Sequence, residues 1–124
     1  MTKRILVIED HEDNRAILRD LLTAAGFGVI EAVNGAEGIA TAEAERPDLI
    51  LMDIQMPVMD GYDATRRLKA NSITASIPVV AVTSYALSDD EAKARAAGCD
   101  GYVTKPFSPR QMLSVIRGFL EKSA

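Results

Sequence analysis

The chain has 124 residues, of which 48% are hydrophobic, so it can bury one core and leaves nothing for a second domain. Its 18 acidic and 14 basic residues give a net charge of -4, which lacks the basic surface that direct nucleic-acid binding requires. No apolar run approaches the roughly 18 residues of a membrane span, and the start MTKRILVIED turns acidic before a signal-peptide core is complete. We therefore expect a cytoplasmic protein without membrane contact.

The first half of the chain predicts two strands and two helices. The apolar run ILVI at 5–8 is typical of a strand covered on both faces. The segment at 14–26 predicts a helix, because its apolar residues recur on one face and a glycine ends it. The more polar run at 27–33 suits an edge strand. Asn34, with Glu37 three residues later, is placed to start the second helix.

The second half continues this alternation with three strands and three helices. LILM at 49–52 and PVVAV at 78–82 are again almost continuously apolar, whereas GYVTK at 101–105 is shorter and suits an edge. Three signals mark the helix starts in this half. They are the turn at Asp60 and Gly61, the capping box SDDE at 88–91, and SPRQ at 108–111, which has a proline at the first helical position.

This order of elements predicts an α/β fold, a doubly wound five-stranded parallel sheet of flavodoxin-like type with five helices. The strand order 2-1-3-4-5 places the two weaker strands at the edges and the three apolar strands inside. No internal repeat, linker or low-complexity tract interrupts residues 1–124. We expect a complete, single-domain protein, since the sequence begins with methionine and no linker follows the last helix.

Polar residues follow the strands at the sheet edge where ligands bind in such folds. Glu9 and Asp10 follow the first strand, Asp53 the third, Thr83 the fourth and Lys105 the fifth. Three carboxylates in one cleft raise one another's pKa unless a cation compensates. Because oxygen ligands suit a hard cation that keeps some waters, the set predicts Mg²⁺.

The same residues predict phosphoryl chemistry. Asp53 is placed to attack phosphorus and form an acyl phosphate, while Thr83 and Lys105 contact the phosphoryl oxygens. Asp10 is expected to bind the metal directly and Glu9 through water. The backbone carbonyl of Gln55, two residues past the nucleophile, is a further predicted ligand.

Four motifs in this order resemble the receiver domain of bacterial two-component response regulators, over the whole chain. They are VIED at 7–10, LILMDIQMPVMDG at 49–61, PVVAVTSYA at 78–86 and GYVTKPF at 101–107. Within that family the chain is similar to the single-domain regulators of chemotaxis and cell division, because no output domain follows the last helix. The resemblance implies a phosphoacceptor that assists its own phosphorylation and dephosphorylation, and not a conventional enzyme.

The resemblance also implies partners and a switch. Asp53 would receive its phosphoryl group from a phosphohistidine on a sensor histidine kinase or a histidine phosphotransfer protein, with Mg²⁺ required. Thr83 would move inward and Tyr102 rotate behind it, so that the face of the fourth helix, fifth strand and fifth helix controls binding of a downstream protein target. The peptide before Pro106 is usually cis in such proteins. Gln55 and Tyr85 occupy the positions that tune the lifetime of the phosphorylated state.

Each of these residues taken alone also has an ordinary structural explanation. An aspartate before a turn usually serves the turn itself, Thr83 is an ordinary strand residue, and Lys105 is an ordinary solvated surface charge. A functional role is favoured only because all of them lie together at the ends of strands. His11 is expected to be a solvated loop residue without a role in the site, and Cys99 is expected in the core. The methionines are expected to serve packing and not a cofactor site; they are Met52, Met56, Met59 and Met112.

Three other functions fit part of the pattern. An aspartyl phosphatase of the haloacid dehalogenase type wants a second aspartate where this chain has Gln55. A flavodoxin-like FMN carrier needs a Gly, Ser and Thr loop after the first strand, which here is acidic. A non-phosphorylated adaptor of receiver shape would commonly lack part of the acidic set.

Two surfaces are expected to bind partners. The alanine-rich helix at 89–97 carries little large apolar surface, so we expect it to be held loosely and to move. The first helix borders the site, and its Ile17 and Leu22 are predicted to form a dock for the histidine donor.

Overall fold

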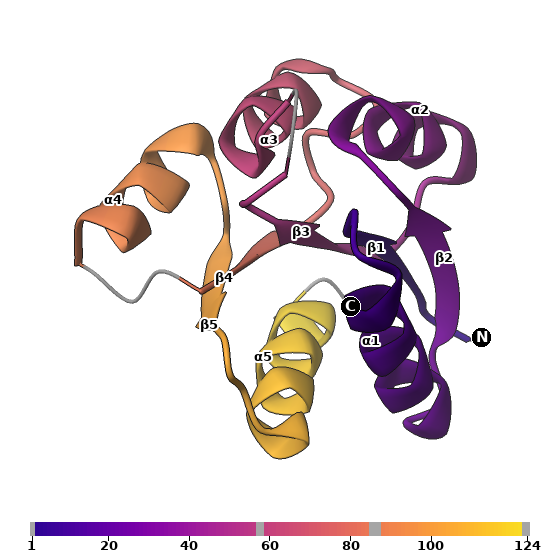
Figure 1. The fold of residues 1–124 in the computed structure, drawn as a ribbon. Helices are drawn as coiled ribbons and strands as arrows, with labels where there is room; N and C mark the ends of the chain where they lie inside the picture. The colour runs from indigo at the N-terminus through magenta and orange to yellow at the C-terminus, as the bar shows by residue number, and fades with distance from the viewer. Residues whose placement is uncertain (1, 57–58, 85–87, 123–124) are drawn as a thin grey trace.

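The computed structural model describes residues 2–56, 59–84 and 88–122, in which strands and helices alternate along the chain (Figure 1). The ten elements are β1 (Arg4–Ile8), α1 (Glu12–Ala24), β2 (Gly28–Ala32), α2 (Gly35–Glu45), β3 (Leu49–Asp53), α3 (Gly61–Ala70), β4 (Val79–Thr83), α4 (Ser88–Ala97), β5 (Gly101–Thr104) and α5 (Pro109–Lys122). The predicted order of five strands and five helices is confirmed.

The five strands form one parallel sheet in the order β2-β1-β3-β4-β5. This is the predicted doubly wound, flavodoxin-like arrangement. β1 lies between β2 and β3, with Leu6 opposite both Ile30 and Ile50. The chain winds one way from β1 to β2 and the other way from β3 onward. The switch point therefore falls at the carboxyl ends of β1 and β3, where ligands bind in open sheets of this type.

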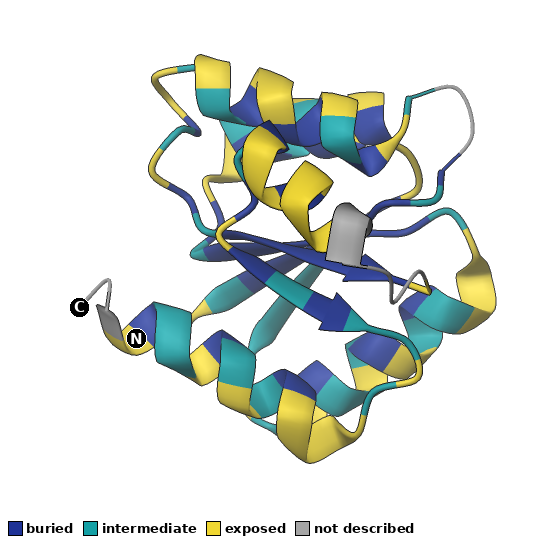
Figure 2. Ribbon diagram, turned by 90° about the vertical axis from the view of Figure 1, so that its left-hand side faces the viewer, coloured by how far each residue is buried: buried dark blue, intermediate teal, exposed yellow. Residues whose placement is uncertain are grey.

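Helices cover both faces of the sheet and give the molecule two cores. Figures 1 and 2 show α1 and α5 on one face and α2, α3 and α4 on the other, with the buried strands between them. Alternating strand residues serve opposite cores: Ile5 and Val7 pack with α1 and α5, whereas Leu6 and Ile8 pack with the core under α2 and α3. The two edge strands are the less buried ones, as their composition predicts.

Side chains and a proline define the helix starts. The side chain of Asn34 accepts a hydrogen bond from the Glu37 amide at 2.8 Å, which confirms it as the cap of α2. Asp60 caps α3 in the same way, and Ser108 accepts from the Gln111 amide ahead of Pro109. α1 starts two residues earlier than predicted, because the two acidic residues after His11 form its first turn. The predicted capping box at 88–91 includes side chains that the structure does not describe.

α3 begins against the end of β3 because its first residue is a glycine. A Cβ atom at Gly61 would lie 2.6 Å from the Asp53 carbonyl oxygen and 2.7 Å from the Ile54 Cα. The Gly61 amide donates to the Ile54 carbonyl at 3.0 Å, which ties the helix start to the strand end. Tyr85, predicted to tune the lifetime of the phosphorylated state, lies outside the described residues. None of the described helices is long and apolar enough to span a membrane.

Candidate functional site

Three carboxylates meet at the switch point of the sheet. Glu9 and Asp10 follow β1 and Asp53 ends β3, and one carboxylate oxygen of each lies within 4.8 Å of the others. Glu9 is 1% exposed and Asp53 4%, so both acidic groups are nearly removed from water. Because β1 and β3 are neighbours in the parallel sheet, their carboxyl ends deliver these side chains to one point. The predicted convergence is confirmed for this trio.

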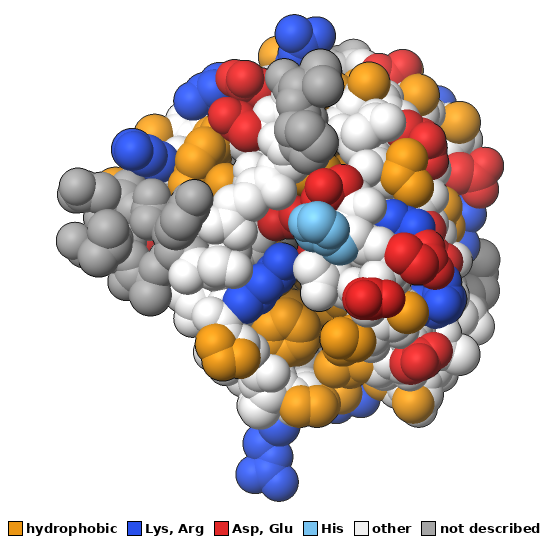
Figure 3. All heavy atoms as spheres, in the orientation of Figure 1, with side chains coloured by type: hydrophobic (Ala, Val, Ile, Leu, Met, Phe, Trp, Pro, Cys, Tyr) orange, Lys and Arg blue, Asp and Glu red, His pale blue; other side chains and the backbone are white. Residues whose placement is uncertain are grey.

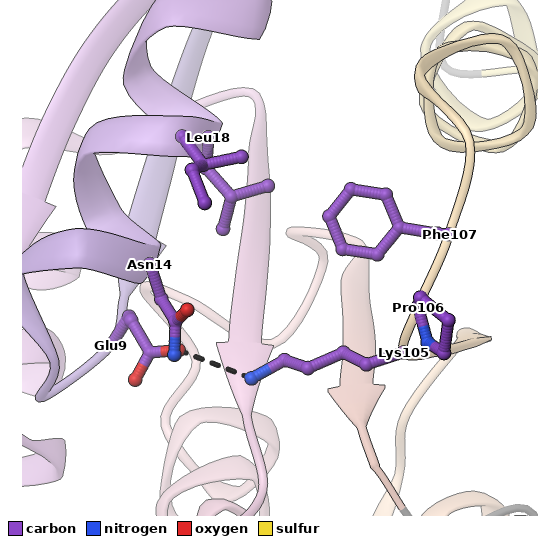
Figure 4. Close-up of a pocket in the computed structure, with 7 residues that line it drawn as sticks. Glu9, Asn14, Leu18, Lys105, Pro106 and Phe107 are labelled. Atoms are coloured by element: carbon purple, nitrogen blue, oxygen red, sulfur yellow. Dashed lines mark hydrogen bonds and ion pairs between the residues drawn. The ribbon is translucent and has the colours of Figure 1, made fainter.

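Lys105 brings one positive charge to the trio. Its Nζ lies 3.2 Å from Glu9 Oε1 and 3.7 Å from Asp53 Oδ1. Figure 4 shows the long side chain reaching from the segment after β5 toward Glu9. The Lys105 amide donates to the Thr83 carbonyl at 2.7 Å, which ties this segment to the end of β4. The peptide between Lys105 and Pro106 is cis, as predicted.

Thr83 and Tyr102 lie on neighbouring strands beside the trio. Thr83 ends β4 and is completely buried, one residue beyond the partner of Asp53 in the register. Tyr102, on β5, is paired with Ala81 on β4 and packs against the core under α2, α3 and α4. Since side chains alternate along strands, Thr83 and Tyr102 project toward the same face of the sheet. The two residues therefore lie on the same face of neighbouring strands, two residues apart in the register, while their motion stays a prediction.

Gln55 links the loops that follow β3 and β4. Its amide donates to Asp53 Oδ1 at 3.1 Å and helps fix the orientation of that carboxylate. Its side-chain oxygen accepts from the Ser84 amide at 3.4 Å. The role of its carbonyl as a metal ligand stays a prediction.

The pKa values of the two most deeply buried carboxyl groups, Asp53 and Glu9, are shifted in opposite directions. Burial, a hydrogen bond with Glu9 and the charge of Glu9 together raise the pKa of Asp53 to about 7. Burial acts in the same sense on Glu9, but hydrogen bonds with Asp53 and the His11 amide, and the charge of Lys105, lower its pKa overall. Without a cation, Asp53 is therefore the member of the pair that holds its proton more tightly.

The donor set fits a hard divalent cation. Asp10 Oδ1 is buried and has no hydrogen-bond partner among the described residues, although it lies within the acidic cluster. A buried carboxylate oxygen without a partner is costly, and a bound cation would supply one. Oxygen ligands with room for water suit Mg²⁺ better than a softer metal.

Comparison with known proteins identifies the family to which this arrangement belongs. Residues 5–117 match the response regulator receiver domain. The chain belongs to this family. The polar-differentiation response regulator DivK of Brucella anthropi is 41% identical over 120 residues, which cover 97% of this chain and 98% of that protein. DivK of Brucella ovis is 40% identical with the same coverage.

Solved receiver structures share the fold. The receiver domain of a sensor histidine kinase from Pseudomonas aeruginosa, with a magnesium ion in its active-site cleft, is 31% identical with a TM-score of 0.91. The match covers 98% of this chain and 99% of that one. The chemotaxis protein CheY4 of Vibrio cholerae is 27% identical with a TM-score of 0.91, covering 96% and 99%.

Membership in the family decides against two of the three other functions that fit part of the sequence pattern. The receiver acts in two-component phosphorelay signalling. The aspartyl phosphatase and the flavodoxin-like FMN carrier are thereby set aside.

One buried residue of the receiver site was missed at the sequence level. Arg15 is 9% exposed and donates from α1 to the backbone carbonyls of Glu9 and Asp10. An arginine in a helix is usually a surface charge, and the residue type alone predicts no role for it. Its position in the sequence does indicate burial, because Arg15 shares the helix face of Leu18 and Leu22, and the three form the buried stripe of α1.

The structure contradicts the predicted docking role of Leu22 and confirms several residues that were expected to have no role in the site. Leu22 is completely buried in the core beneath α1, so it cannot dock a partner, whereas Ile17 is 59% exposed. The prediction for Leu22 is wrong because Leu22 belongs, with Arg15 and Leu18, to the buried stripe by which α1 packs on the sheet. His11 has an exposed side chain and Cys99 is buried, both as predicted. The predicted packing role holds for three buried methionines, Met52, Met56 and Met112, and for Met59, which packs partly buried against the core.

Proposed function

We propose that this receiver accepts a phosphoryl group on Asp53 from a phosphohistidine, in a reaction that requires Mg²⁺. The convergence of three carboxylates within 4.8 Å, with the ammonium group of Lys105 against two of them, is the observation that carries this proposal. Buried acids are brought together at such cost only where a cation or a reacting group compensates for their charge.

The transfer is a single displacement at phosphorus. A carboxylate oxygen of Asp53 forms the new O–P bond while the N–P bond to the histidine breaks, and the imidazole leaves with the bonding electron pair. The product is an acyl phosphate on Asp53. Lys105 pairs with one phosphoryl oxygen, and the Thr83 hydroxyl donates to another. Thr83 ends β4, which neighbours β3, and Lys105 follows β5, which lies one strand further on. Both groups therefore reach the phosphoryl group from the same side.

Four residues would hold the metal. Asp10, Asp53 and the carbonyl of Gln55 bind it directly, and Glu9 binds through water. When bound, Mg²⁺ neutralises the charge on the carboxylates and on the transferring group. The receiver itself is a phosphoacceptor that assists its own phosphorylation and dephosphorylation, and not an enzyme in the conventional sense.

The phosphoryl donor is a sensor histidine kinase or a histidine phosphotransfer protein, which docks beside the acidic site. A cavity of about 270 Å³ lies there between α1 and the segment after β5. Figure 4 shows Leu18 and Phe107 lining it next to Glu9 and Lys105. Figure 3 shows a hydrophobic patch on the same face as the histidine and the acidic side chains, next to a basic side chain that lies between them. The exposed Ile17 belongs to this cavity and supports α1 as the docking helix.

Docking can be separated from chemistry with two phosphoryl donors. Ile17→Glu places a charge on the proposed contact and leaves the carboxylates intact. We expect phosphorylation by a histidine donor to slow by about tenfold, which corresponds to roughly 1.4 kcal/mol. Phosphorylation by acetyl phosphate is expected to stay unchanged. Equal rates with the histidine donor for both proteins would exclude this docking surface.

The output surface is the face of α4, β5 and α5. Inward movement of Thr83 and rotation of Tyr102 change this face when Asp53 is phosphorylated, and a downstream protein target binds one of the two forms. The two residues lie on neighbouring strands and project to the same side, which supports a coupled movement.

The proposal is tested by intact-mass measurement after incubation with acetyl phosphate, with and without Mg²⁺. We expect a phosphoryl adduct on the wild type only when Mg²⁺ is present, and none on Asp53→Asn. An equal adduct on the variant would show that another residue is the acceptor, and a wild type without any Mg²⁺-dependent adduct would refute the assignment.

A further inference from the structure

Arg15 reaches from α1 to the backbone that carries two of the three carboxylates. Its Nη1 donates to the Glu9 carbonyl at 2.9 Å and to the Asp10 carbonyl at 3.3 Å. The residue is 9% exposed, which is rare for an arginine unless its donors are satisfied. None of these contacts involves the carboxylates themselves, so Arg15 acts on the loop and not on the ligand atoms.

Two acidic side chains fix the guanidinium from its other edges. Nε lies 3.5 Å from Glu31 Oε1 on β2, and Nη2 contacts Glu12 in the first turn of α1. A guanidinium is planar and presents its donors in a rigid fork, so pairing two edges determines where the third points. The orientation of Nη1 toward the two carbonyls is therefore set by β2 and α1 together.

Apart from Arg15, the loop between β1 and α1 is held through the Glu9 side chain, which accepts from the His11 amide at 3.2 Å and pairs with Lys105 Nζ at 3.2 Å. The parallel pairing of β1 ends just past Ile8, where the Glu9 amide donates to the Ala32 carbonyl at 3.1 Å. Beyond that point the Glu9 and Asp10 carbonyls leave the sheet. The orientation of these two peptide groups decides where the attached carboxylates point.

We propose that Arg15 is a positioning residue for the divalent cation: it holds the backbone of Glu9 and Asp10 so that their carboxylates meet Asp53. This inference rests on the proposed function, because it assumes that the trio binds Mg²⁺. Outer contacts of this kind orient metal ligands, and their loss typically weakens metal affinity by about 10 to 100-fold.

Electrostatics alone would have the opposite effect. A positive guanidinium near the trio repels a cation, so its removal would tighten Mg²⁺ binding. Glu12 and Glu31 pair with Arg15, so its removal would also leave two unpaired carboxylates, which again favours a cation. Electrostatics therefore predicts tighter Mg²⁺ binding by Arg15→Met and positioning predicts weaker binding, so the sign of the change in affinity distinguishes the two.

The test is calorimetric titration of Mg²⁺ into the wild type, Arg15→Met, Arg15→Lys and Arg19→Met. We expect both Arg15 variants to bind Mg²⁺ about 10 to 100-fold more weakly. Lysine keeps the charge but lacks the planar fork, so weak binding by Arg15→Lys assigns the effect to geometry. Arg19 lies one turn further along α1 and pairs with the same Glu31 at 3.0 Å. Arg19→Met is therefore a matched control that should bind like the wild type.

Urea unfolding of each variant without metal separates positioning from a structural role. A residue that only stabilises the fold would lower the free energy of unfolding and leave the Mg²⁺ affinity of the folded protein unchanged. Wild-type affinity in both folded Arg15 variants, or tighter binding by Arg15→Met, would overturn the inference. If Arg15→Met does not fold, the affinity of Arg15→Lys decides. A wild type that binds no Mg²⁺ contradicts the proposed function instead.

Discussion

Asp53 is nearly removed from water and lies beside a second carboxyl group, and both conditions disfavour its charged form. In the metal-free protein its pKa is raised from 3.8 to about 7. The folded state then binds this proton more tightly than the unfolded chain does. The contribution of Asp53 to stability therefore falls as the pH rises from about 4 to about 7. A reactive carboxylate is kept here at the expense of the metal-free fold.

We expect Asp53→Asn to stabilise the protein at alkaline pH when no metal is present. Asparagine keeps the shape of the side chain and carries no charge at any of these pH values. At pH 8 the variant should exceed the wild type by on the order of 2 kcal/mol in free energy of unfolding, and at pH 4 by much less. Urea unfolding in the presence of a chelator measures both. A variant that is less stable than the wild type at pH 8 would show that the buried charge is compensated by groups of the protein itself.

At the scale of elements, the approach of α3 to β3 depends on one glycine. A Cβ atom at position 61 would lie 2.6 Å from the Asp53 carbonyl oxygen, which is backbone and cannot turn aside. We expect Gly61→Ala to lower the free energy of unfolding by about 1 to 3 kcal/mol and to reduce phosphorylation, because the end of β3 must shift. Chemical denaturation and acetyl phosphate labelling test both effects.

Gly118 is the matched control for this substitution. It lies inside α5, and nothing surrounds its hypothetical Cβ within 4 Å. Alanine is the better helix former, so Gly118→Ala should raise stability by about 0.5 to 1 kcal/mol. A similar gain from both substitutions would mean that the contact at Gly61 relaxes and that only backbone freedom matters.

The described side chains of α4 bury little apolar surface against the sheet. Within 91–97 the buried residues are Ala94 and Ala97, so few large groups hold this helix to the sheet. We expect amide hydrogen exchange in α4 and β5 to change when beryllium fluoride mimics the phosphoryl group, and exchange in α2 to stay constant. Identical exchange across α4, β5 and α5 in the two states would contradict the proposed output face.

At the scale of the whole molecule, the sequence contained the topology and the convergence of the acidic trio. Continuous apolar runs, capping residues and glycines determine a parallel sheet, and the rules of parallel sheets bring strand ends together. Asp53 and Glu9 could therefore be placed from their positions at the ends of strands. The same reasoning placed Lys105 and Thr83, because each follows a strand of the same sheet.

The rest depends on packing between distant segments. Whether Leu22 faces solvent or the core is decided by how α1 lies on the sheet, and a small shift of the apolar stripe reverses the answer. The role of Arg15 depends on Glu31, which comes from another strand, so its environment is not local in the sequence. Charge pairs of this kind require the folded arrangement before they can be recognised.

The central claim is that a divalent cation neutralises the trio and leaves Asp53 free to carry the phosphoryl group. A crystal structure grown with Mg²⁺ and beryllium fluoride tests it most directly. We predict beryllium fluoride on Asp53, and Mg²⁺ bound by carboxylates of Asp10 and Asp53 and by the Gln55 carbonyl, at about 2.1 Å. A metal ion bound away from the three carboxylates, or beryllium fluoride on a different residue, would contradict the account.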